Sequence, residues 1–454
     1  MSGELFRPIF VPDRFREAVS GRAWLEAMLA AEAALAVAQA RADLVPPEAA
    51  EIIATRSEVN LLDPEEIGHA GRAAGNPVPP LVKALTASVS GVSKDAARYV
   101  HKGATSQDIT DTAAMLVARR ALDLILAEVD GIAAACARLA KAHRDTLMAG
   151  RTLLQQALPT TFGLKAAGWL VSVLEARRRL LDVRGSTLAA QLGGAAGTLA
   201  SLGGSGISVL EEFARELDLA EPVVPWHTDR TRVAEVGGAL SLLAGVLGKI
   251  ALDVILMAQT EVGEVAEPCD PGGQGRGGSS TLPHKRNPIL SVTVAASTRR
   301  VQDLSRTLQA AITQEHERAA GAWHSEWEAL SDALALTGGA AAAMREVTEG
   351  LEVNPEKMRE NLYETKGMLM AENVTTVVAN LLGRLEAHEL VEAASRRAAD
   401  SGRPFREELL AEPVLRERLS TEQIDAALDP EGYLGSAGAF VDRALALYRR
   451  EVPT

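Results

Sequence analysis

The 454-residue sequence is poor in cysteine and in aromatic residues. Its two cysteines, Cys136 and Cys269, exclude a disulfide scaffold and a cysteine-rich zinc site. So few cysteines are typical of a reducing compartment, and we expect a cytoplasmic protein. Aromatic residues make up only 4% of the chain, and the period-2 alternation of half-buried strands is scarce. The composition therefore favours helices.

The sequence also lacks an excess of positive charge and a long unbroken apolar run. Its 47 Lys and Arg are outnumbered by 60 Asp and Glu, a net charge of −13, which argues against a nucleic-acid partner or a polybasic membrane anchor. The uncharged stretch 236–248 is too short to cross a bilayer, and 185–210 is broken by repeated glycines. The start, MSGELFRPIF, lacks a signal-peptide pattern. We expect no membrane segment.

Residues that favour helices are abundant, because Ala and Leu dominate and Glu, Arg and Lys supply much of the rest. Uninterrupted helical patterns predict four long helices, at 22–41, 107–143, 159–183 and 231–262. Several of them exceed the usual helix length of about 11–12 residues. The start of the second has a capping-box pattern, Thr105 followed by Asp108.

The segment 231–262 is apolar on most of its faces, as in a helix buried in a large core or a subunit interface. We therefore predict an all-α fold, a long-helix bundle whose remaining apolar faces are covered by oligomerisation. Composition divides the chain into an N-terminal helical domain (1–100), a central long-helix bundle (101–350) and a C-terminal helical domain (351–454).

The most informative stretch is 268–288, PCDPGGQGRGGSSTLPHKRNP. Its glycines lower the cost of unusual backbone angles and expose N–H groups. A hydroxyl, a cation and an amide follow directly, which suits a segment that closes over an anion. The alternative is an ordinary surface loop. A phosphate loop is excluded because no Gly-Lys-Ser/Thr follows the glycines, and a dinucleotide-binding turn is disfavoured because no strand precedes them.

Three segments carry a resemblance to a known family. GSSTLPHKRNP resembles the signature of the fumarase/aspartase superfamily, with Leu282 in place of the usual methionine. HKGATSQDITDT (101–112) and GRTLLQQALPTTFGLK (150–165) are similar to its two other substrate-binding segments. The phrases QLGGAAGTLASL and QEHERAAGAWHSEWEAL look most like the bacterial branch that closes a lactone on 3-carboxy-cis,cis-muconate, with adenylosuccinate lyases as near relatives.

The resemblance implies a homotetramer with a central helical core, in which the three motif regions meet from different subunits. It implies a small tricarboxylate substrate and a step of aromatic-compound degradation. Superfamily members move a proton next to a carboxylate through an aci-carboxylate dianion, so cations and N–H donors must face that carboxylate. By motif position, Ser279 transfers the proton, and Lys285 and Asn287 hold the carboxylate. No redox step occurs, so we expect no cofactor.

The other segments supply further candidate residues. Thr105 and Ser106 stand where a helix begins, so they can bind a carboxylate, act as simple N-caps, or do both. His101 resembles a histidine used for substrate binding or proton transfer, and its alternative is a surface role. The resemblance also implies a set of substrate ligands: Gln107, Arg151, Thr152, Gln155, Ser280 and Arg318. No histidine pair has H-E-x-x-H spacing, so we expect no metal.

Leu153 departs from the superfamily pattern. The resemblance places a histidine there, after Arg-Thr, which helps to protonate a leaving group. A leaving carboxylate needs no such proton, because it is stable as an anion. Leu153 therefore favours cycloisomerisation over the alternative, β-elimination of the adenylosuccinate-lyase type. A catalytically silent structural protein is a second alternative, and a sulfonate-bearing muconate is an open choice of substrate.

Overall fold

The computed structural model describes residues 3–268 and 285–452, and its architecture confirms the all-α prediction. Five helices of 21 to 37 residues carry most of the central sequence: α7 (Ser106–Ala142), α8 (Phe162–Asp182), α10 (Thr231–Met257), α11 (Ile289–Ala310) and α12 (Ala322–Gly350). The N-terminal third holds α1 (Gly3–Phe10), α2 (Asp13–Ala18), α3 (Gly21–Arg41), α4 (Pro47–Arg56), α5 (Pro64–Gly71) and α6 (Val78–Ser90), and α9 (Gly206–Glu216) precedes α10.

The chain divides into two compact units, each built from separate stretches of sequence. Unit 1 comprises Met1–Val129, Glu175–Lys249 and Thr293–Met344, and unit 2 comprises Asp130–Leu174, Ile250–Val292 and Arg345–Thr454. The five long helices therefore contribute residues to both units. This division follows contacts in space, whereas the three regions expected from the sequence follow composition along the chain, and that expectation stays a prediction.

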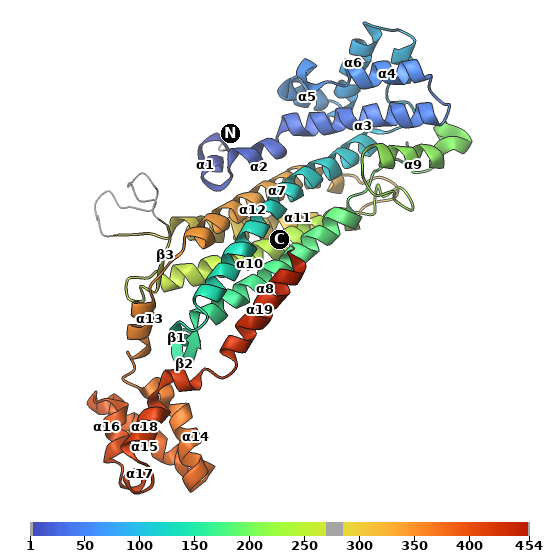
Figure 1. Ribbon diagram of the computed structural model, residues 1–454. Helices are drawn as coiled ribbons and strands as arrows, with labels where there is room; N and C mark the ends of the chain where they lie inside the picture. Colours follow the sequence, from blue (N-terminus) through green and yellow to red (C-terminus); the bar gives the residue numbers. More distant parts are fainter. Residues whose placement is uncertain (1–2, 269–284, 453–454) are drawn as a thin grey trace. The chain divides into compact units, whose positions relative to one another are not determined.

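In unit 1, α3 is a long apolar helix that organises the N-terminal part of the chain. Its N-cap, Ser20, accepts a hydrogen bond at Oγ from the Ala23 amide, which satisfies one of the free N–H groups of the first turn. Helices α4 and α9 pack against it, and Figure 1 shows α4 beside its C-terminal half. Two polar side chains are buried in this apolar helix, Glu32 and Gln39.

The predicted helix starts agree with the structure except at α8. Helix α7 begins at Ser106, and the Asp108 carboxylate accepts the Thr105 amide proton at 2.9 Å, half of the predicted capping box. Helix α8 begins at Phe162 rather than at 159. The reason is that Gln155–Thr161 forms β2, an antiparallel partner of β1 (Leu147–Thr152).

The β1–β2 hairpin turns through Leu153 and Leu154, and both have positive φ, at 50° and 67°. A two-residue hairpin loop needs this backbone geometry, and Asn-Gly or Gly-Gly normally supplies it. For a β-carbon-bearing leucine it costs about 1–2 kcal/mol per residue. Both side chains are also highly exposed, at 97% and 75%. An apolar, strained tip therefore projects from the second unit.

The C-terminal part of unit 2 is a group of short helices around its own core. That core includes Val378, Val391, Phe405 and Leu409, all buried. The helices around this core are α14 (Ala371–Leu382), α15 (Arg384–Ser401), α16 (Phe405–Ala411), α17 (Pro413–Arg418) and α18 (Thr421–Leu428). Helix α13 (Pro355–Leu362) precedes this group, and α19 (Ala437–Glu451) follows it. A two-stranded sheet of β3 (Val265–Ala266) and β4 (Glu352–Val353) completes the unit.

Candidate active site

The turn that precedes α7 carries His101 and is held by α3. His101 has a left-handed φ of 57°, and Gly103 has a φ of 78°. The Gln39 amide donates to the Lys102 carbonyl at 2.5 Å, and the Glu32 carboxylate contacts His101 Nδ1 at 2.6 Å. The side chains of Gln39 and Glu32, both on α3, therefore hold the turn at His101 in its strained backbone conformation.

Asp108 joins three distant segments of unit 1. Its fully buried carboxylate accepts the amide protons of Thr105, Gly193 and Gly194, each at 2.9 Å. It also contacts His227 Nε2 at 2.7 Å. Four such contacts compensate the desolvation of a buried carboxylate. Asp108 therefore fixes the start of α7 against the 193–194 loop and His227.

Gln107 and Arg318, two predicted substrate ligands, lie in direct contact. Arg318 Nη1 donates to Gln107 Oε1 at 2.9 Å, and its Nη2 donates to the carbonyls of Gly194 and Ala195. Gln107 is buried, and its amide nitrogen donates to Asp111 and to the His227 carbonyl. Arg318 thus has three neutral acceptors, and no ion pair of Arg318 occurs in the described part of the chain. Its charge stays available to an anion.

Behind Gln107 lies a buried ion triad. Arg230 donates twice to Asp111, at 2.7 and 2.9 Å, and three times to Glu326. Trp323 Nε1 adds a hydrogen bond to Asp111 at 2.9 Å. Burial raises the pKa of the Glu326 carboxyl, and the charge of Asp111 adds to the rise, although Arg230 opposes it. Burial by itself lowers the pKa of Arg230, but the charges and hydrogen bonds of Asp111 and Glu326 outweigh burial and raise that pKa. The triad holds Asp111, which accepts a hydrogen bond from Gln107, and it thereby supports the Gln107–Arg318 pair.

In unit 2, Arg151 is paired within the protein. Its guanidinium makes two hydrogen bonds to the Glu264 carboxylate, at 2.9 and 2.7 Å. Glu264 is fully buried, and Asn361 donates to it at 3.0 Å. The charge of Arg151 is therefore neutralised internally, unlike that of Arg318. Thr152 and Gln155, which flank the hairpin tip, are both exposed.

The signature segment lies only partly within the described residues. Ser279 and Ser280 lie outside them, as does the glycine-rich stretch. Lys285 is described and exposed, and Asn287 is half-buried. Between them, Arg286 makes two hydrogen bonds to Glu352 on β4 and one to the Glu267 carbonyl. The hydrogen bonds from Arg286 lower the pKa of the Glu352 carboxyl.

The Glu267 carboxylate caps the helix that follows the signature. It accepts the Leu290 and Ser291 amide protons at 3.0 and 2.7 Å, and the Ser291 hydroxyl at 2.6 Å. A carboxylate is favoured at a helix N-terminus by the free N–H groups and the dipole. The backbone on either side of Lys285 and Asn287 is therefore tied down at Glu267 and at β4.

The predicted residues fall into two groups. Unit 1 holds His101, Thr105, Ser106, Gln107 and Arg318, and unit 2 holds Arg151, Thr152, Gln155, Lys285 and Asn287. Sequence reasoning missed a set of buried polar residues that support them: Glu32, Asp111, Arg230, Glu264 and Glu326. A usable signal existed for Glu32 alone, because it is the one charged residue in the apolar run 27–40.

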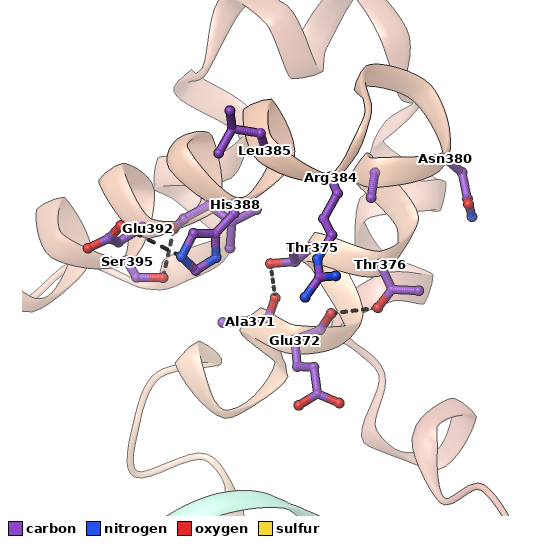
Figure 2. Close-up of a pocket in the computed structure, with 12 residues that line it drawn as sticks. Ala371, Glu372, Thr375, Thr376, Asn380, Arg384, Leu385, His388, Glu392 and Ser395 are labelled. Carbon is purple, nitrogen blue, oxygen red and sulfur yellow. Dashed lines mark hydrogen bonds and ion pairs between the residues drawn. The ribbon is translucent and has the colours of Figure 1, made fainter.

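A separate cavity of about 910 Å³ lies along α14 and α15. Figure 2 shows Arg384 and His388 among its lining side chains, with Thr375 and Thr376 bonded to their own helix backbone. None of the predicted site residues lines it. Within residues 3–268 and 285–452, no group of three or more His, Cys, Asp or Glu is arranged to hold a metal ion.

Comparison with known proteins identifies the family. Residues 11–303 match the family described as lyase, and residues 367–444 match the adenylosuccinate lyase C-terminus. The chain is 45% identical over 447 residues to a 3-carboxy-cis,cis-muconate cycloisomerase of Bradyrhizobium diazoefficiens, with 98% of both chains covered. It is 46% identical over 457 residues to a nitrosuccinate lyase of Streptomyces davaonensis, with 99% of this chain and 96% of that one covered.

The fold agrees with this assignment. The structure of 3-carboxy-cis,cis-muconate lactonizing enzyme from Pseudomonas putida superimposes with a TM-score of 0.93, at 43% identity over 99% of both chains. The predicted superfamily is thereby confirmed by sequence and by structure. The chain belongs to the lyase family of the fumarase/aspartase superfamily, the family that includes these cycloisomerases and lyases.

Proposed function

We propose that this chain is a cycloisomerase that converts 3-carboxy-cis,cis-muconate to a carboxymuconolactone. The observation that carries the proposal is the full-length match, in sequence and in fold, to proteins named for that reaction. The uncompensated charge of Arg318 supports an anionic substrate. The direct test is the loss of 3-carboxymuconate absorbance on addition of the purified protein, with formation of the lactone followed by NMR.

The proposed reaction needs no group beyond the chain's own residues. One substrate carboxylate oxygen forms a bond to a carbon of the conjugated double bond, and the π electrons move onto a second carboxylate as an aci-carboxylate. Lys285 and Asn287 stabilise that charge, and Ser279 delivers a proton to the adjacent carbon. Arg318, Thr105 and Ser106 bind a remaining carboxylate, and Ser280, Thr152 and Gln155 complete the ligand set.

Gln107 and Arg151, two of the predicted substrate ligands, position other residues in this proposal instead of binding the substrate. Gln107 uses its amide on Asp111, on the His227 carbonyl and on Arg318, and Arg151 is paired with Glu264. Polar groups already satisfied inside the protein gain little by turning to a ligand. We therefore propose that Gln107 positions Arg318, and that Arg151 positions the hairpin strand on which Thr152 lies.

We propose a cytoplasmic homotetramer that shares its active sites between subunits. Fewer than half of the residues in the most apolar window of α10 are buried within the chain, 44%, and Leu242 and Leu252 are about half exposed. The exposed leucines of the hairpin tip also indicate that a surface of another subunit covers them. Sedimentation tests the tetramer. Mixing the inactive variants Ser279→Ala and Arg318→Ala tests the shared sites, because mixed tetramers would regain some intact sites.

A second candidate is β-elimination of a group that leaves as a stable anion. The nitrosuccinate lyase relative is as similar to this chain as the cycloisomerase relatives are. Nitrite, like a carboxylate, needs no proton to depart, so Leu153 fits this reaction as well. Elimination of the adenylosuccinate type, whose leaving amine needs a proton, fits less well, although the C-terminal match carries that name. Release of nitrite from nitrosuccinate without consumption of 3-carboxymuconate would establish the second candidate.

A further inference from the structure

Helix α3 presents two buried polar side chains to the His101 turn. Glu32 and Gln39 are seven residues apart and therefore share one face of the helix, and their exposed fractions are 1% and 0%. Glu32 binds the His101 side chain, and Gln39 binds the next carbonyl in the chain. Buried polar groups in an apolar helix are costly unless they are paired. Both are therefore placed where they hold this turn.

The contact between Glu32 and His101 fixes where the histidine carries its protons. A carboxylate accepts and does not donate, so the 2.6 Å contact places a proton on His101 Nδ1. The other carboxylate oxygen, Glu32 Oε2, is buried without a hydrogen-bond partner. Within the described residues, His101 is the one cationic partner of Glu32. A buried carboxylate with so few partners is stabilised most when the histidine is doubly protonated.

The surroundings of His101 favour its charged form. Burial by itself lowers the pKa of His101, but the hydrogen bond and charge of Glu32, with the charge of Asp108, outweigh burial and hold the pKa above its ordinary value. The neighbouring cation, Lys102, donates its ammonium to the Leu44 carbonyl. With Nδ1 engaged by Glu32, Nε2 is the ring atom left for a ligand, and the side chain is 20% exposed.

We propose that Glu32 is a positioning residue that keeps His101 as an imidazolium and directs its Nε2–H to a carboxylate of the substrate. His101 stands four residues before Thr105, in the segment assigned above to carboxylate binding. The inference rests on the proposed function for the identity of the substrate. Its consequence is a pH-dependent affinity, because substrate binding weakens once His101 loses its proton.

The test compares Glu32→Gln with Glu26→Gln, a control on the same helix whose carboxylate pairs with Arg22 and Arg120 instead. Glu32→Gln keeps the side-chain shape but removes the charge. A fall of about one unit in the pKa of His101 corresponds to about a tenfold loss of the imidazolium above that pKa. We therefore expect KM to rise about tenfold at neutral pH and to recover at acid pH, while Glu26→Gln follows the wild type.

A double-mutant cycle separates this role from a structural one. His101→Gln should raise KM without recovery at acid pH, and Glu32→Gln should add nothing in that background, because Glu32 acts through His101. Equal losses at every pH, in both backgrounds, would make Glu32 merely structural and overturn the proposal. A KM profile of Glu32→Gln that matches the wild type would overturn it as well.

A measurement made without substrate tests the role of Glu32 independently of the proposed function. NMR titration of the His101 ring should give a lower pKa in Glu32→Gln than in the wild type, whatever the substrate. If Glu32→Gln does not fold, Glu32→Asp serves, because it moves the carboxylate away from the ring and should lower the pKa of His101 by less. An unchanged His101 titration in the folded variant refutes the role of Glu32. Failure of the wild type to consume 3-carboxymuconate refutes only the proposed function.

Discussion

Arg318 Nη1 donates a hydrogen bond to Gln107 Oε1 at 2.9 Å, across 211 residues of sequence. The bond joins the start of α7 to the loop before α12, and it orients a guanidinium whose other acceptors are backbone carbonyls. A cation whose partners are neutral can pair with an anionic ligand. Arg151 and Arg230, in contrast, are already paired with buried carboxylates. This difference in partners is the reason why we propose Arg318, rather than Arg151 or Arg230, as a substrate-binding arginine.

Replacement of Arg318 by lysine should therefore weaken substrate binding more than it weakens the fold. Lysine keeps the charge but loses the planar fork that reaches several acceptors at once. A hydrogen bond to a charged group contributes about 1.5–3 kcal/mol, so KM should rise roughly 10- to 100-fold. Steady-state kinetics and thermal melting measure the two effects, and Arg299→Lys, at an exposed position, is the control. An unchanged KM would remove Arg318 from the site.

Arg230→Met should strongly destabilise the chain. It leaves Asp111 and Glu326 buried without their cation, and breaking a buried ion pair from one side typically costs about 3–5 kcal/mol. Arg184→Met is the matched control, because the Arg184–Asp123 pair is half exposed and such pairs contribute about 0–1 kcal/mol. Urea unfolding measures both free energies. Similar losses in the two variants would contradict the structural role given to the triad.

The His101–Glu32 pair should make the free energy of unfolding depend on pH. The folded chain holds the pKa of His101 above its ordinary value, so the folded state binds that proton more tightly than the unfolded state. The stabilisation is fully present below about pH 6.5, the unfolded value, and is lost as pH rises through the folded pKa. Unfolding of the wild type and of His101→Gln across this range should give a difference that shrinks with increasing pH. A constant difference would exclude the linkage.

Ser279→Ala should abolish turnover and leave substrate binding largely intact. In the proposed mechanism Ser279 transfers the proton, and loss of a general acid typically costs about 10²–10⁴-fold in rate. Lys285→Ala should impair both KM and kcat, because its charge serves the bound substrate and the transition state alike. Binding measured by calorimetry on the Ser279 variant separates the two effects. Near-wild-type kcat in Ser279→Ala would transfer the proton-transfer role to His101.

The sequence sufficed to predict the long helices and the contact between Thr105 and Asp108. Helix α10 was predictable because its apolar character extends over many turns, and the role of Asp108 at the α7 start follows from its spacing to Thr105. The hairpin was not predictable, because Leu-Leu is an unfavourable pair for a two-residue turn. Local propensity therefore extended the next helix to 159, whereas the pairing of β1 with β2 delays its start.

The buried polar residues that support the site could not be predicted from the sequence for a different reason. Asp108 meets His227 across 119 residues, and Arg230 meets Glu326 across 96. Such contacts arise when segments far apart in the sequence pack together, and no pattern within one segment encodes them. The same holds for the neutralisation of Arg151 by Glu264, 113 residues away. Sequence motifs indicate which residues belong to a site, but the distribution of charge among them needs the fold.

Substitutions at the hairpin tip test whether Leu153 and Leu154 serve activity at the expense of stability. Leu153→Asn combined with Leu154→Gly creates a pair that adopts positive φ easily, so it should relieve strain of about 1–2 kcal/mol per residue. The variant should be more stable as a separate chain. If the leucines are retained because an apolar tip completes an active site in the tetramer, the same variant should lose activity. Greater stability with unchanged activity would argue against that role.

Single substitutions at Leu153 separate the reaction classes. Leu153→Phe should keep lactonising activity, because it keeps an apolar side chain at an exposed position of the hairpin tip. Leu153→His should not improve lactonisation, because the attacking carboxylate carries no proton to remove at neutral pH. The wild type should release no fumarate from adenylosuccinate, argininosuccinate or malate, because each leaving group needs an acid that Leu153 cannot supply. A side-by-side assay of these substrates with 3-carboxymuconate and nitrosuccinate checks this expectation. Rapid fumarate release from any of the first three, without consumption of 3-carboxymuconate, would assign the chain to the proton-assisted lyases.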